Sequence, residues 1–380
     1  MADKKYRAAV IGMGSISHMH MSGYNQVEAV EVVAGADPHP DAHASYKEKY
    51  GIEDSYEDHR EMLEAVKPDL VSVCTWHGLH AEFTIAAAEA GVKGIICEKP
   101  MCISVGEADR MIAAAEANGS RLVIGHQRRF TSGWERSRQL VTEGAIGEPL
   151  LVETRVIEGL LNWGTHTIDG LRYVLGDPEA EWVMGAVERR TDRFERNVPI
   201  EDACMGLVQF KDRAQALIES DLTADGSAGE FLIRGSEGML EVAEQWYRLF
   251  NSSSGGWQKE EISQQIPEVK QVEELIEWIE GGPEHRGAAK NGRAAVEIMM
   301  ALYQSARVNQ VVRLPLDETG YPLELMINEG RLPVEVPGAY DIRSFLVKGS
   351  EEDTLWAKMR SEGKGLEEFH AELRRRAQGG

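Results

Sequence analysis

The feature that most restricts the fold is an alternation of short apolar runs with longer helical patterns between residues 5 and 126. Near-continuously apolar strands that alternate with helices are typical of a parallel sheet covered on both faces. We therefore expect an α/β domain at the N-terminal end. Its expected strands are residues 7–11, 30–36, 69–74, 94–97 and 121–124, and its expected helices are residues 16–27, 40–49, 56–65, 81–90 and 104–118.

The first apolar run leads directly into Gly12-Met13-Gly14-Ser15-Ile16 and then into a helical pattern. The first glycine permits a tight turn, the second lets a pyrophosphate approach the backbone, and the helix N-terminus supplies N–H donors. Asp37 ends the second apolar run, where a carboxylate can bond the ribose hydroxyls and repel the 2′-phosphate of NADP. We therefore expect a Rossmann domain that binds NAD. The alternative is a glycine turn and a solvated aspartate without any ligand.

Beyond residue 126 the pattern changes to short strands in succession, which predicts a largely antiparallel sheet. The expected strands are residues 150–158, 181–190, 203–210, 214–221, 230–235 and 239–243, with helices at 133–143, 167–175 and 291–308. The expected domains are a Rossmann domain (1–126), an α+β substrate and oligomerisation domain with an open, mostly antiparallel sheet (127–313), and a C-terminal extension (314–380). The extension is either an arm onto a partner subunit or a packed tail.

Composition limits the partners and the location. A chain of 380 residues is too long for one core, and its net charge of −22 disfavours nucleic acid and anionic membranes as partners. No apolar run approaches the roughly 18 residues of a membrane span, and the first apolar run is too short for a signal peptide. The four cysteines lack the spacing of a metal site. We expect a cytoplasmic protein without a metal.

Several ordered motifs together resemble the glucose–fructose oxidoreductase / inositol dehydrogenase / rhizopine-catabolism (Gfo/Idh/MocA) family over residues 6–310. They are Val10-Ile-Gly-Met-Gly14, Cys74-Thr75 with His80, Glu98-Lys99-Pro100, Gly125-His-Gln-Arg-Arg-Phe130 and Gly164-Thr-His166-Thr-Ile-Asp169. The family's fold is a Rossmann domain followed by an α/β domain with an open, mostly antiparallel sheet, which matches the order of elements predicted above. The resemblance implies an NAD-dependent oxidoreductase.

The resemblance also implies roles for individual residues. Lys99 reaches the substrate beside the nicotinamide, and His166 is a catalytic acid or base. A histidine titrates in the right range for a hydroxyl proton, and an ammonium lowers the cost of developing alkoxide charge. The expected cofactor contacts are Gly12, Met13, Gly14, Ser15, Ile16, Asp37, Thr75, Trp76, His77, His80, Glu98 and Lys99, and the expected substrate contacts are Arg128, Trp163 and Thr165.

Two positions depart from the family pattern. Asn162 replaces the aspartate that family dehydrogenases carry four residues before the histidine, and an amide can orient His166 without stabilising an imidazolium. Either Lys99 or His166 can therefore be the base. Trp76-His77 replaces the common Pro-Asn, so that His77 either touches the nicotinamide ribose or fills an altered turn.

Four other residues have a structural alternative to a role in catalysis. Asp169 is expected to cap or pair within its own helix. Three residues either bind the substrate or pack between the domains: Arg128, Arg129 and Trp163.

Three functions fit these features. The first is a dehydrogenase that transfers hydride between NAD and a secondary hydroxyl of a sugar, glycoside or cyclitol, with Asn162, Lys99 and His166 in its catalytic site. The second is redox-neutral glycoside cleavage or elimination through a keto-sugar intermediate. The third is a protein that binds NAD or sugar without turnover. Open sheets bury a face against another subunit, so a homodimer or homotetramer is expected.

Overall fold

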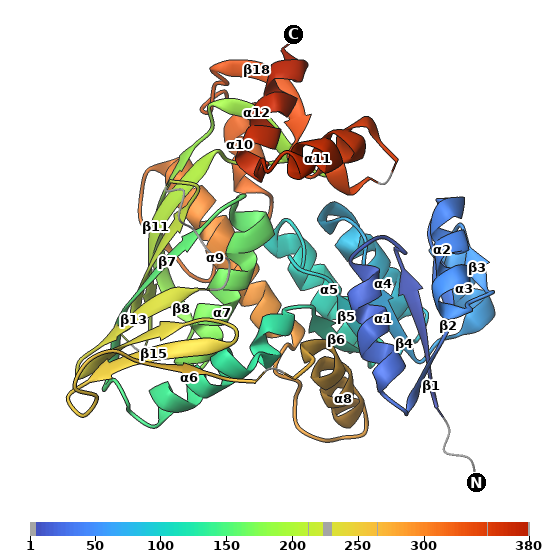
Figure 1. Cartoon of the computed structure of the whole chain (residues 1–380), viewed down its shortest axis with the longest axis horizontal. Helices are drawn as coiled ribbons and strands as arrows, with labels where there is room; N and C mark the ends of the chain where they lie inside the picture. The colour runs from blue at the N-terminus through green and yellow to red at the C-terminus, as the bar shows by residue number, and fades with distance from the viewer. Residues whose placement is uncertain (1–4, 212, 223–229, 264, 348, 379–380) are drawn as a thin grey trace.

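The chain forms three parts, visible in Figure 1 as a parallel-sheet domain in blue and cyan, a large sheet, and a C-terminal segment in red. The structure is a computed structural model. It describes residues 5–211, 213–222, 230–263, 265–347 and 349–378. The long helix α9 (Ala289–Val308) lies between the large sheet and the parallel-sheet domain (Figure 1).

The first part is a six-stranded parallel sheet in the order β3-β2-β1-β4-β5-β6, which confirms the predicted Rossmann fold. Both faces of the sheet bury apolar side chains, as its near-continuously apolar strands require. The strands are β1 (Tyr6–Ile11), β2 (Val30–Ala36), β3 (Ser55–Tyr56), β4 (Leu70–Val73), β5 (Gly94–Cys97) and β6 (Arg121–Ile124). The helices are α1 (Ser17–Gln26), α2 (Pro40–Tyr50), α3 (His59–Val66), η1 (His77–Leu79), α4 (His80–Glu89) and α5 (Val105–Ala117).

The second part is a nine-stranded sheet in the order β16-β15-β14-β13-β7-β12-β11-β8-β17. Only the β7–β12 pair is parallel among its described pairs, so the sheet is mostly antiparallel, as predicted. The strands are β7 (Pro149–Val156), β8 (Ala180–Glu188), β11 (Ala203–Phe210), β12 (Gln215–Ser220), β13 (Phe231–Gly235), β14 (Gly238–Val242), β15 (Trp246–Asn251), β16 (Gln258–Glu261) and β17 (Val312–Arg313).

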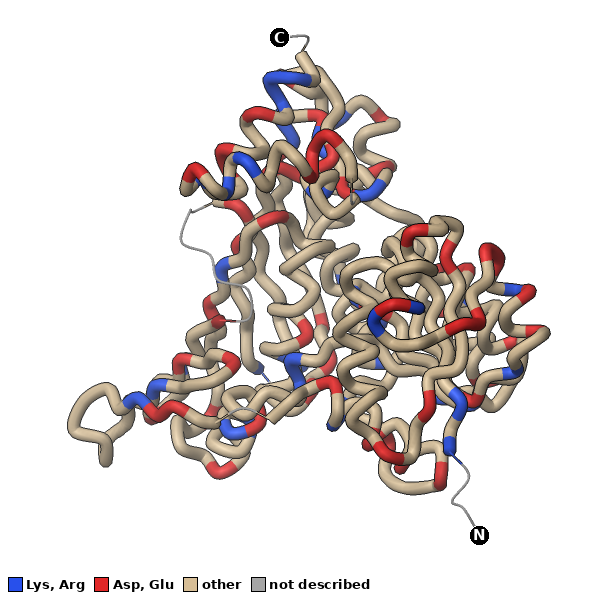
Figure 2. Tube along the Cα trace, turned by 45° about the vertical axis from the view of Figure 1, so that its right-hand side comes forward, with Lys and Arg blue, Asp and Glu red and all other residues tan. Residues whose placement is uncertain are grey.

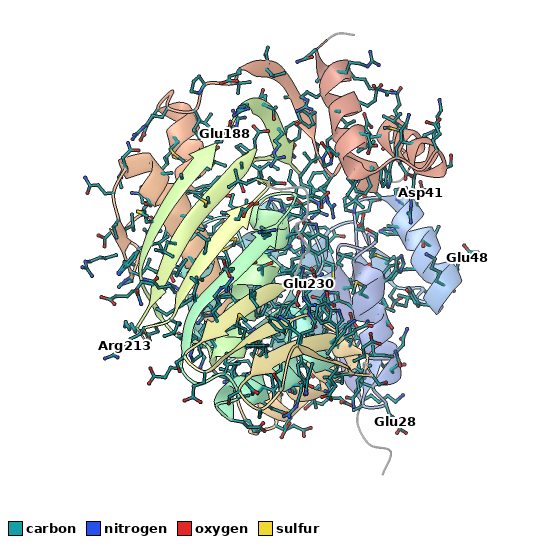
Figure 3. The ribbon with its side chains drawn as sticks, turned by 60° about the vertical axis from the view of Figure 1, so that its left-hand side comes forward. Glu28, Asp41, Glu48, Glu188, Arg213 and Glu230 are labelled. Atoms are coloured by element: carbon teal, nitrogen blue, oxygen red, sulfur yellow. The ribbon has the colours of Figure 1, made fainter. Side chains whose placement is uncertain are left out.

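One face of this sheet is covered and the other is open. Helices η2 (Gln127–Phe130), α6 (Ser132–Thr142), α7 (Thr165–Leu175) and α9 lie on the covered side, and α9 packs against β8 where Gly185 N–H donates to Ser305 Oγ at 3.0 Å. No described helix lies over the opposite face, which is turned to the viewer in Figure 3. Met184 and Met205 are 51% and 46% exposed on that face.

Several elements differ from the sequence prediction. The strand expected at 150–158 ends at Val156, because Glu158 and Gly159 have positive φ angles of 61° and 85° and turn the chain away. Strand β16 was missed because Gln-Lys-Glu-Glu shows no apolar alternation and is held by backbone pairing with β15. Helix α8 (Pro267–Ile279) was not predicted, and it packs against α1 of the Rossmann domain.

The C-terminal extension packs on its own chain. Its strand β18 (Val336–Asp341) pairs in parallel with β9 (Thr191–Glu195), and β10 (Val198–Pro199) completes a three-stranded sheet. Phe369 is fully buried beneath it. The other elements are α10 (Pro322–Asn328), η4 (Ser344–Leu346), α11 (Glu351–Ser361) and α12 (Leu366–Ala377).

The net charge of −22 is spread over the molecule. Figure 2 shows acidic residues spread over all three parts, with basic residues interspersed among them. All four cysteines are buried free thiols. Among the described helices, none combines the length and the apolar character needed to cross a membrane. The described residues contain no group of three or more His, Cys, Asp or Glu side chains arranged to hold a metal ion.

Candidate active site

The glycine turn lies at the carboxyl end of β1. Gly12 has a φ of 86°, and a Cβ there would lie 2.8 Å from the carbonyl oxygen of Cys74, so only glycine fits this turn. A Cβ on Gly14 would meet nothing within 4 Å, which leaves the backbone open to a ligand. The Met13 N–H donates to Asp37 Oδ2 at 2.8 Å, so the predicted ribose-binding carboxylate lies beside the turn. Ser15 is exposed at the start of α1, and Ile16 is half-buried.

Next to this turn, the loop after β4 presents polar atoms without partners. Thr75 Oγ1 and both ring nitrogens of His77 are buried and have no hydrogen-bond partner among the described residues. Burial, with a smaller contribution from the Arg196 charge, holds the pKa of His77 well below its usual value, so its ring is neutral. Trp76 is 41% exposed beside it. Orphaned polar atoms beside an open glycine turn fit a dinucleotide.

His80 and Glu98 connect the loops that carry these residues. The His80 ring nitrogens lie 2.8 Å from the Pro100 carbonyl oxygen and 3.0 Å from that of Thr75. Glu98 Oε1 lies 2.9 Å from His20 Nε2. Both side chains are buried and use their polar atoms within the protein. They therefore hold the cofactor loops in place through contacts that need no ligand.

Lys99 follows β5, before a cis peptide bond to Pro100, and points at the second part of the chain. Its Nζ donates to the main-chain oxygen of Asn162 at 3.1 Å and lies 3.4 Å from Asn162 Oδ1. It also lies 5.2 Å from the centre of the Trp163 ring. Burial lowers the pKa of Lys99 to about 8, against the opposing effect of the Glu98 carboxylate. About one tenth of this amine is therefore uncharged at pH 7.

A π turn, Leu160–Gly164, positions Asn162 and Trp163 ahead of α7. Two carboxylates fix the backbone where the chain enters this turn. Asp221 accepts the N–H groups of Glu158 and Gly159 at 2.7 and 2.8 Å. Glu201 accepts the N–H group of Leu160 at 2.8 Å. Single π turns occur often at functional sites. This one brings the second part of the chain to the Lys99 amine.

His166, in the first turn of α7, faces the same place. Its ring lies 5.6 Å from that of Trp163, and its Nδ1 is buried without a hydrogen-bond partner in the described part of the chain. Burial, with the Lys99 charge next in importance, holds the pKa of His166 well below its usual value. Asn162 does not orient this ring as expected, because its hydrogen bonds join it to Lys99 and Glu158.

Asp169 corrects a second expectation, since it pairs outside its own helix. Its carboxylate accepts Arg129 Nε and Nη2, both at 2.7 Å, and both side chains are completely buried. His126 lies between this pair and Thr165, whose hydroxyl oxygen is 3.0 Å from His126 Nε2. Thr165 is fully buried. Arg129 and Asp169 therefore join η2 to α7 behind the site.

Arg128 completes the surroundings of the indole. Its guanidinium lies 5.1 Å from the centre of the Trp163 ring, and its Nε lies 3.1 Å from Glu244 Oε1. Arg128 Nη1 is buried and unpartnered among the described residues. The Trp163 ring thus lies beside two cationic groups, the Lys99 ammonium and the Arg128 guanidinium.

Three charged residues near Lys99 were not predicted from the sequence: Glu158, Glu195 and Arg343. Glu158 precedes Gly159, and that glycine was the only sequence signal of a turn there. Glu195 is buried at the end of β9, and burial raises its pKa. Arg343 comes from the C-terminal extension, for which no motif was recognised. The extension therefore contributes directly to the surroundings of the site.

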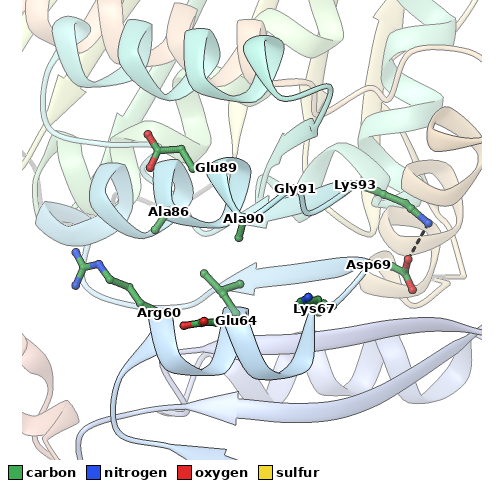
Figure 4. A pocket seen from close by; sticks show the side chains of 11 residues that line it. Arg60, Glu64, Lys67, Asp69, Ala86, Glu89, Ala90, Gly91 and Lys93 are labelled. Atoms are coloured by element: carbon green, nitrogen blue, oxygen red, sulfur yellow. Dashed lines mark hydrogen bonds and ion pairs between the residues drawn. The ribbon is translucent and has the colours of Figure 1, made fainter.

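A surface hollow between α3 and α4 is a separate feature (Figure 4). It is lined by Arg60, Lys67, Asp69 and Lys93, and an ion pair of 2.8 Å joins the last two. It lies at the amino ends of β4 and β5. Ligands of open parallel sheets bind at the carboxyl ends, so this hollow is on the wrong edge for a cofactor.

Models of known protein families match both domains of the chain. Residues 6–126 match the oxidoreductase family with an NAD-binding Rossmann fold, and residues 134–241 match the GFO/IDH/MocA C-terminal domain. The D-glucoside 3-dehydrogenase of Escherichia coli is 27% identical over 348 residues, covering 83% of this chain and 99% of that protein. The myo-inositol 2-dehydrogenase of Thermotoga maritima is 29% identical over 232 residues, covering 57% and 69%.

A solved structure has the same fold. The WlbA dehydrogenase of Bordetella pertussis, determined in complex with NADH and UDP-GlcNAcA, matches with a TM-score of 0.70 at 21% identity. The match covers 83% of this chain and 100% of that one. The order of a Rossmann domain and an open-sheet domain is therefore shared between the two proteins.

Proposed function

This chain belongs to the Gfo/Idh/MocA family of NAD-dependent oxidoreductases, and we propose that it oxidises a secondary hydroxyl of a sugar, glycoside or cyclitol. The named relatives act on glucosides and inositol, which supports this substrate class. The observation that carries the proposal is the convergence of Lys99 from one domain with Trp163 and His166 from the other. NAD, when bound, supplies the hydride acceptor.

The cofactor would be held by the residues at the carboxyl edge of the parallel sheet. The turn Gly12-Met13-Gly14-Ser15-Ile16 offers backbone N–H groups and the α1 N-terminus to the pyrophosphate. Asp37 would accept ribose hydroxyls. Thr75, Trp76 and His77 would line the nicotinamide side, while His80 and Glu98 hold their loops.

Lys99 is proposed as the base that takes the hydroxyl proton. A base works best when it is strong yet unprotonated at the working pH, and a pKa of about 8 lets this amine act as a base in the mildly alkaline range. His166, neutral and with Nδ1 free, would hydrogen-bond the same oxygen. Arg128 and Trp163 would bind the sugar ring, and the indole face suits its C–H surface. Thr165, expected to contact the substrate, is instead fully buried with its hydroxyl on His126, and it would support the site through that ring.

The pH dependence tests which group is the base. If it is Lys99, the oxidation rate falls about tenfold per pH unit below a midpoint near 8, because the ammonium cannot accept a proton. Asn162→Asp places a carboxylate beside Nζ, favours the ammonium, and moves this midpoint to higher pH. Asn118→Asp, the same change at an exposed helix end, leaves it unmoved. A midpoint well below 6.5 in the parent would assign the base to His166.

The activity itself is tested by incubating the protein with NAD⁺ and a panel of inositols, hexoses and methyl glucosides. A dehydrogenase produces the absorbance of NADH with at least one of them. Cleavage of a nitrophenyl glycoside without net NADH would instead favour the redox-neutral elimination. Binding of NAD without either product would favour the sensor.

We also propose a homodimer or homotetramer that buries the open face of the nine-stranded sheet. Cross-strand neighbours Leu207 and Leu217 lie on this face with Met184 and Met205, which form an apolar patch of the kind that marks protein contacts. Light scattering measures the assembly directly, and a monomer at micromolar concentration would contradict the proposed oligomer.

We also propose a cytoplasmic location, because a reducing cytoplasm would keep the four buried thiols unpaired.

A further inference from the structure

We infer that Arg343, in the C-terminal extension, is a positioning residue of the active site. It holds the carboxylate of Glu158, which in turn holds Trp163 and Asn162 against the Lys99 amine. The inference rests on the proposed function of that site. It gives the extension a part in catalysis that the Rossmann and sheet domains do not supply by themselves.

The contacts form a continuous chain from the extension to the amine. Arg343 Nη1 lies 3.1 Å from Glu158 Oε2, and the two side chains are only 15% and 7% exposed. The same oxygen accepts the Trp163 Nε1–H at 2.6 Å and the Asn162 Nδ2–H at 3.4 Å. Trp163 and Asn162 both contact Lys99 Nζ. One carboxylate oxygen thus joins the arginine to both neighbours of the amine.

The backbone at Glu158 has a strained conformation that its surroundings must stabilise. Its φ of 61° is in the left-handed region, which residues with a side chain rarely adopt. Residues in such conformations cluster at functional sites. Asp221 holds that conformation by accepting the N–H of Glu158 at 2.7 Å. Glu158 Oε1 and Arg343 Nε are buried without hydrogen-bond partners among the described residues, as expected of groups that face a polar ligand.

The extension docks through contacts that do not need the Arg343 side chain. Strand β18 pairs with β9 through the backbone, and Asp341 accepts the N–H groups of Arg196 and Arg343 at 3.0 and 2.8 Å. Phe369 is fully buried against this segment. Replacing the guanidinium should therefore leave the extension in place and change only what the guanidinium reaches.

The charge of Arg343 also acts on Lys99. Burial is the main cause that lowers the pKa of Lys99, and the positive charges of Arg196 and Arg343 lower it further. The ionisable groups around this amine are Glu98, Glu195, Arg196, Arg343, His77, His126 and His166. Removing the Arg343 charge raises the pKa of Lys99, so more of the amine is protonated at neutral pH.

Three variants test the inference: Arg343→Met, Arg343→Lys, and Arg360→Met as a matched change at an exposed position of α11. The first readout is the rate of acetylation of Lys99 by acetic anhydride against pH in the cofactor-free protein, followed by peptide mass spectrometry. We expect a midpoint near 8 in the parent, a higher midpoint in Arg343→Met, and a return toward the parent in Arg343→Lys. An unmoved midpoint in Arg343→Met, or no return in Arg343→Lys, would overturn the inference.

The second readout is turnover of the best substrate from the sugar and cyclitol panel. Arg343→Met is expected to lower kcat by about 10-fold to 100-fold, because small misplacements of a reacting group have effects of this size, with KM for NAD⁺ unchanged. Trp163→Phe removes the N–H group that Glu158 accepts. The double variant Arg343→Met/Trp163→Phe should lower kcat little more than the more damaging single change does. Additive losses would overturn the relay. If the parent oxidises nothing, the proposed function fails while the acetylation result still stands.

Discussion

Lys99→Met is expected to lower kcat by about 100-fold to 10,000-fold while NAD⁺ binds almost as tightly as in the parent. The range is that of a lost general base, and methionine keeps the length of the side chain without its amine. The Lys99 Nζ contacts Asn162 and Trp163 of the other domain, so cofactor affinity should change little. Stopped-flow rates and calorimetric NAD⁺ titration measure the two quantities separately.

Lys93→Met is the matched control for this change. Lys93 lies just before the same strand β5, at its opposite end, and its amine pairs with Asp69 on the surface. Its replacement should leave kcat within about twofold, because exposed ion pairs contribute little. Parent-like turnover in Lys99→Met would remove this amine from the mechanism.

Arg129→Met has the largest expected effect on stability, a loss of about 3–5 kcal/mol in the free energy of unfolding. The Arg129 guanidinium and the Asp169 carboxylate are completely buried and joined by two bonds of 2.7 Å. Removing the guanidinium leaves the Asp169 charge in the interior without its cation. The neighbouring His126 is a poor replacement, because burial lowers the pKa of its ring and keeps it neutral. Urea unfolding followed by circular dichroism measures the loss.

Arg136→Met provides the comparison for this prediction. Arg136 is on α6 of the same domain and pairs with Glu143 at 3.4 Å, with both side chains well exposed. Its replacement should cost no more than about 1 kcal/mol. Equal losses in the two variants would mean that the buried pair between η2 and α7 does not stabilise the domain as described.

Much of the fold could be predicted because most strands of the Rossmann domain are nearly continuously apolar and are separated by helices. The Gly12 turn and Asp37 were recognised from spacing alone, and they lie together. The missed elements carry weaker patterns. Strand β16 is polar in every residue, and β18 contains Pro337 and Gly338, which disguise a strand held by its partner β9.

The site was only partly predictable, because several of its contacts join residues that are distant in the chain. Lys99 and His166 stood in recognisable motifs. Glu158 and Arg343 are separated by 185 residues, and nothing in the local sequence of either indicates the other. The same holds for Asp169, whose buried partner Arg129 lies 40 residues earlier in the chain. Its helix gave no reason to expect a partner outside it.

The most direct test of the account follows hydrogen from sugar to cofactor. The protein is incubated with NAD⁺ and with glucose or myo-inositol that carries deuterium on every carbon, and the mass of the recovered cofactor is measured. Hydride transfer at the Lys99 site predicts that the cofactor gains one deuterium in the parent and almost none in Lys99→Met. A parent protein that binds NAD⁺ and returns it without deuterium, with these and every other deuterated sugar of the panel, would contradict the account.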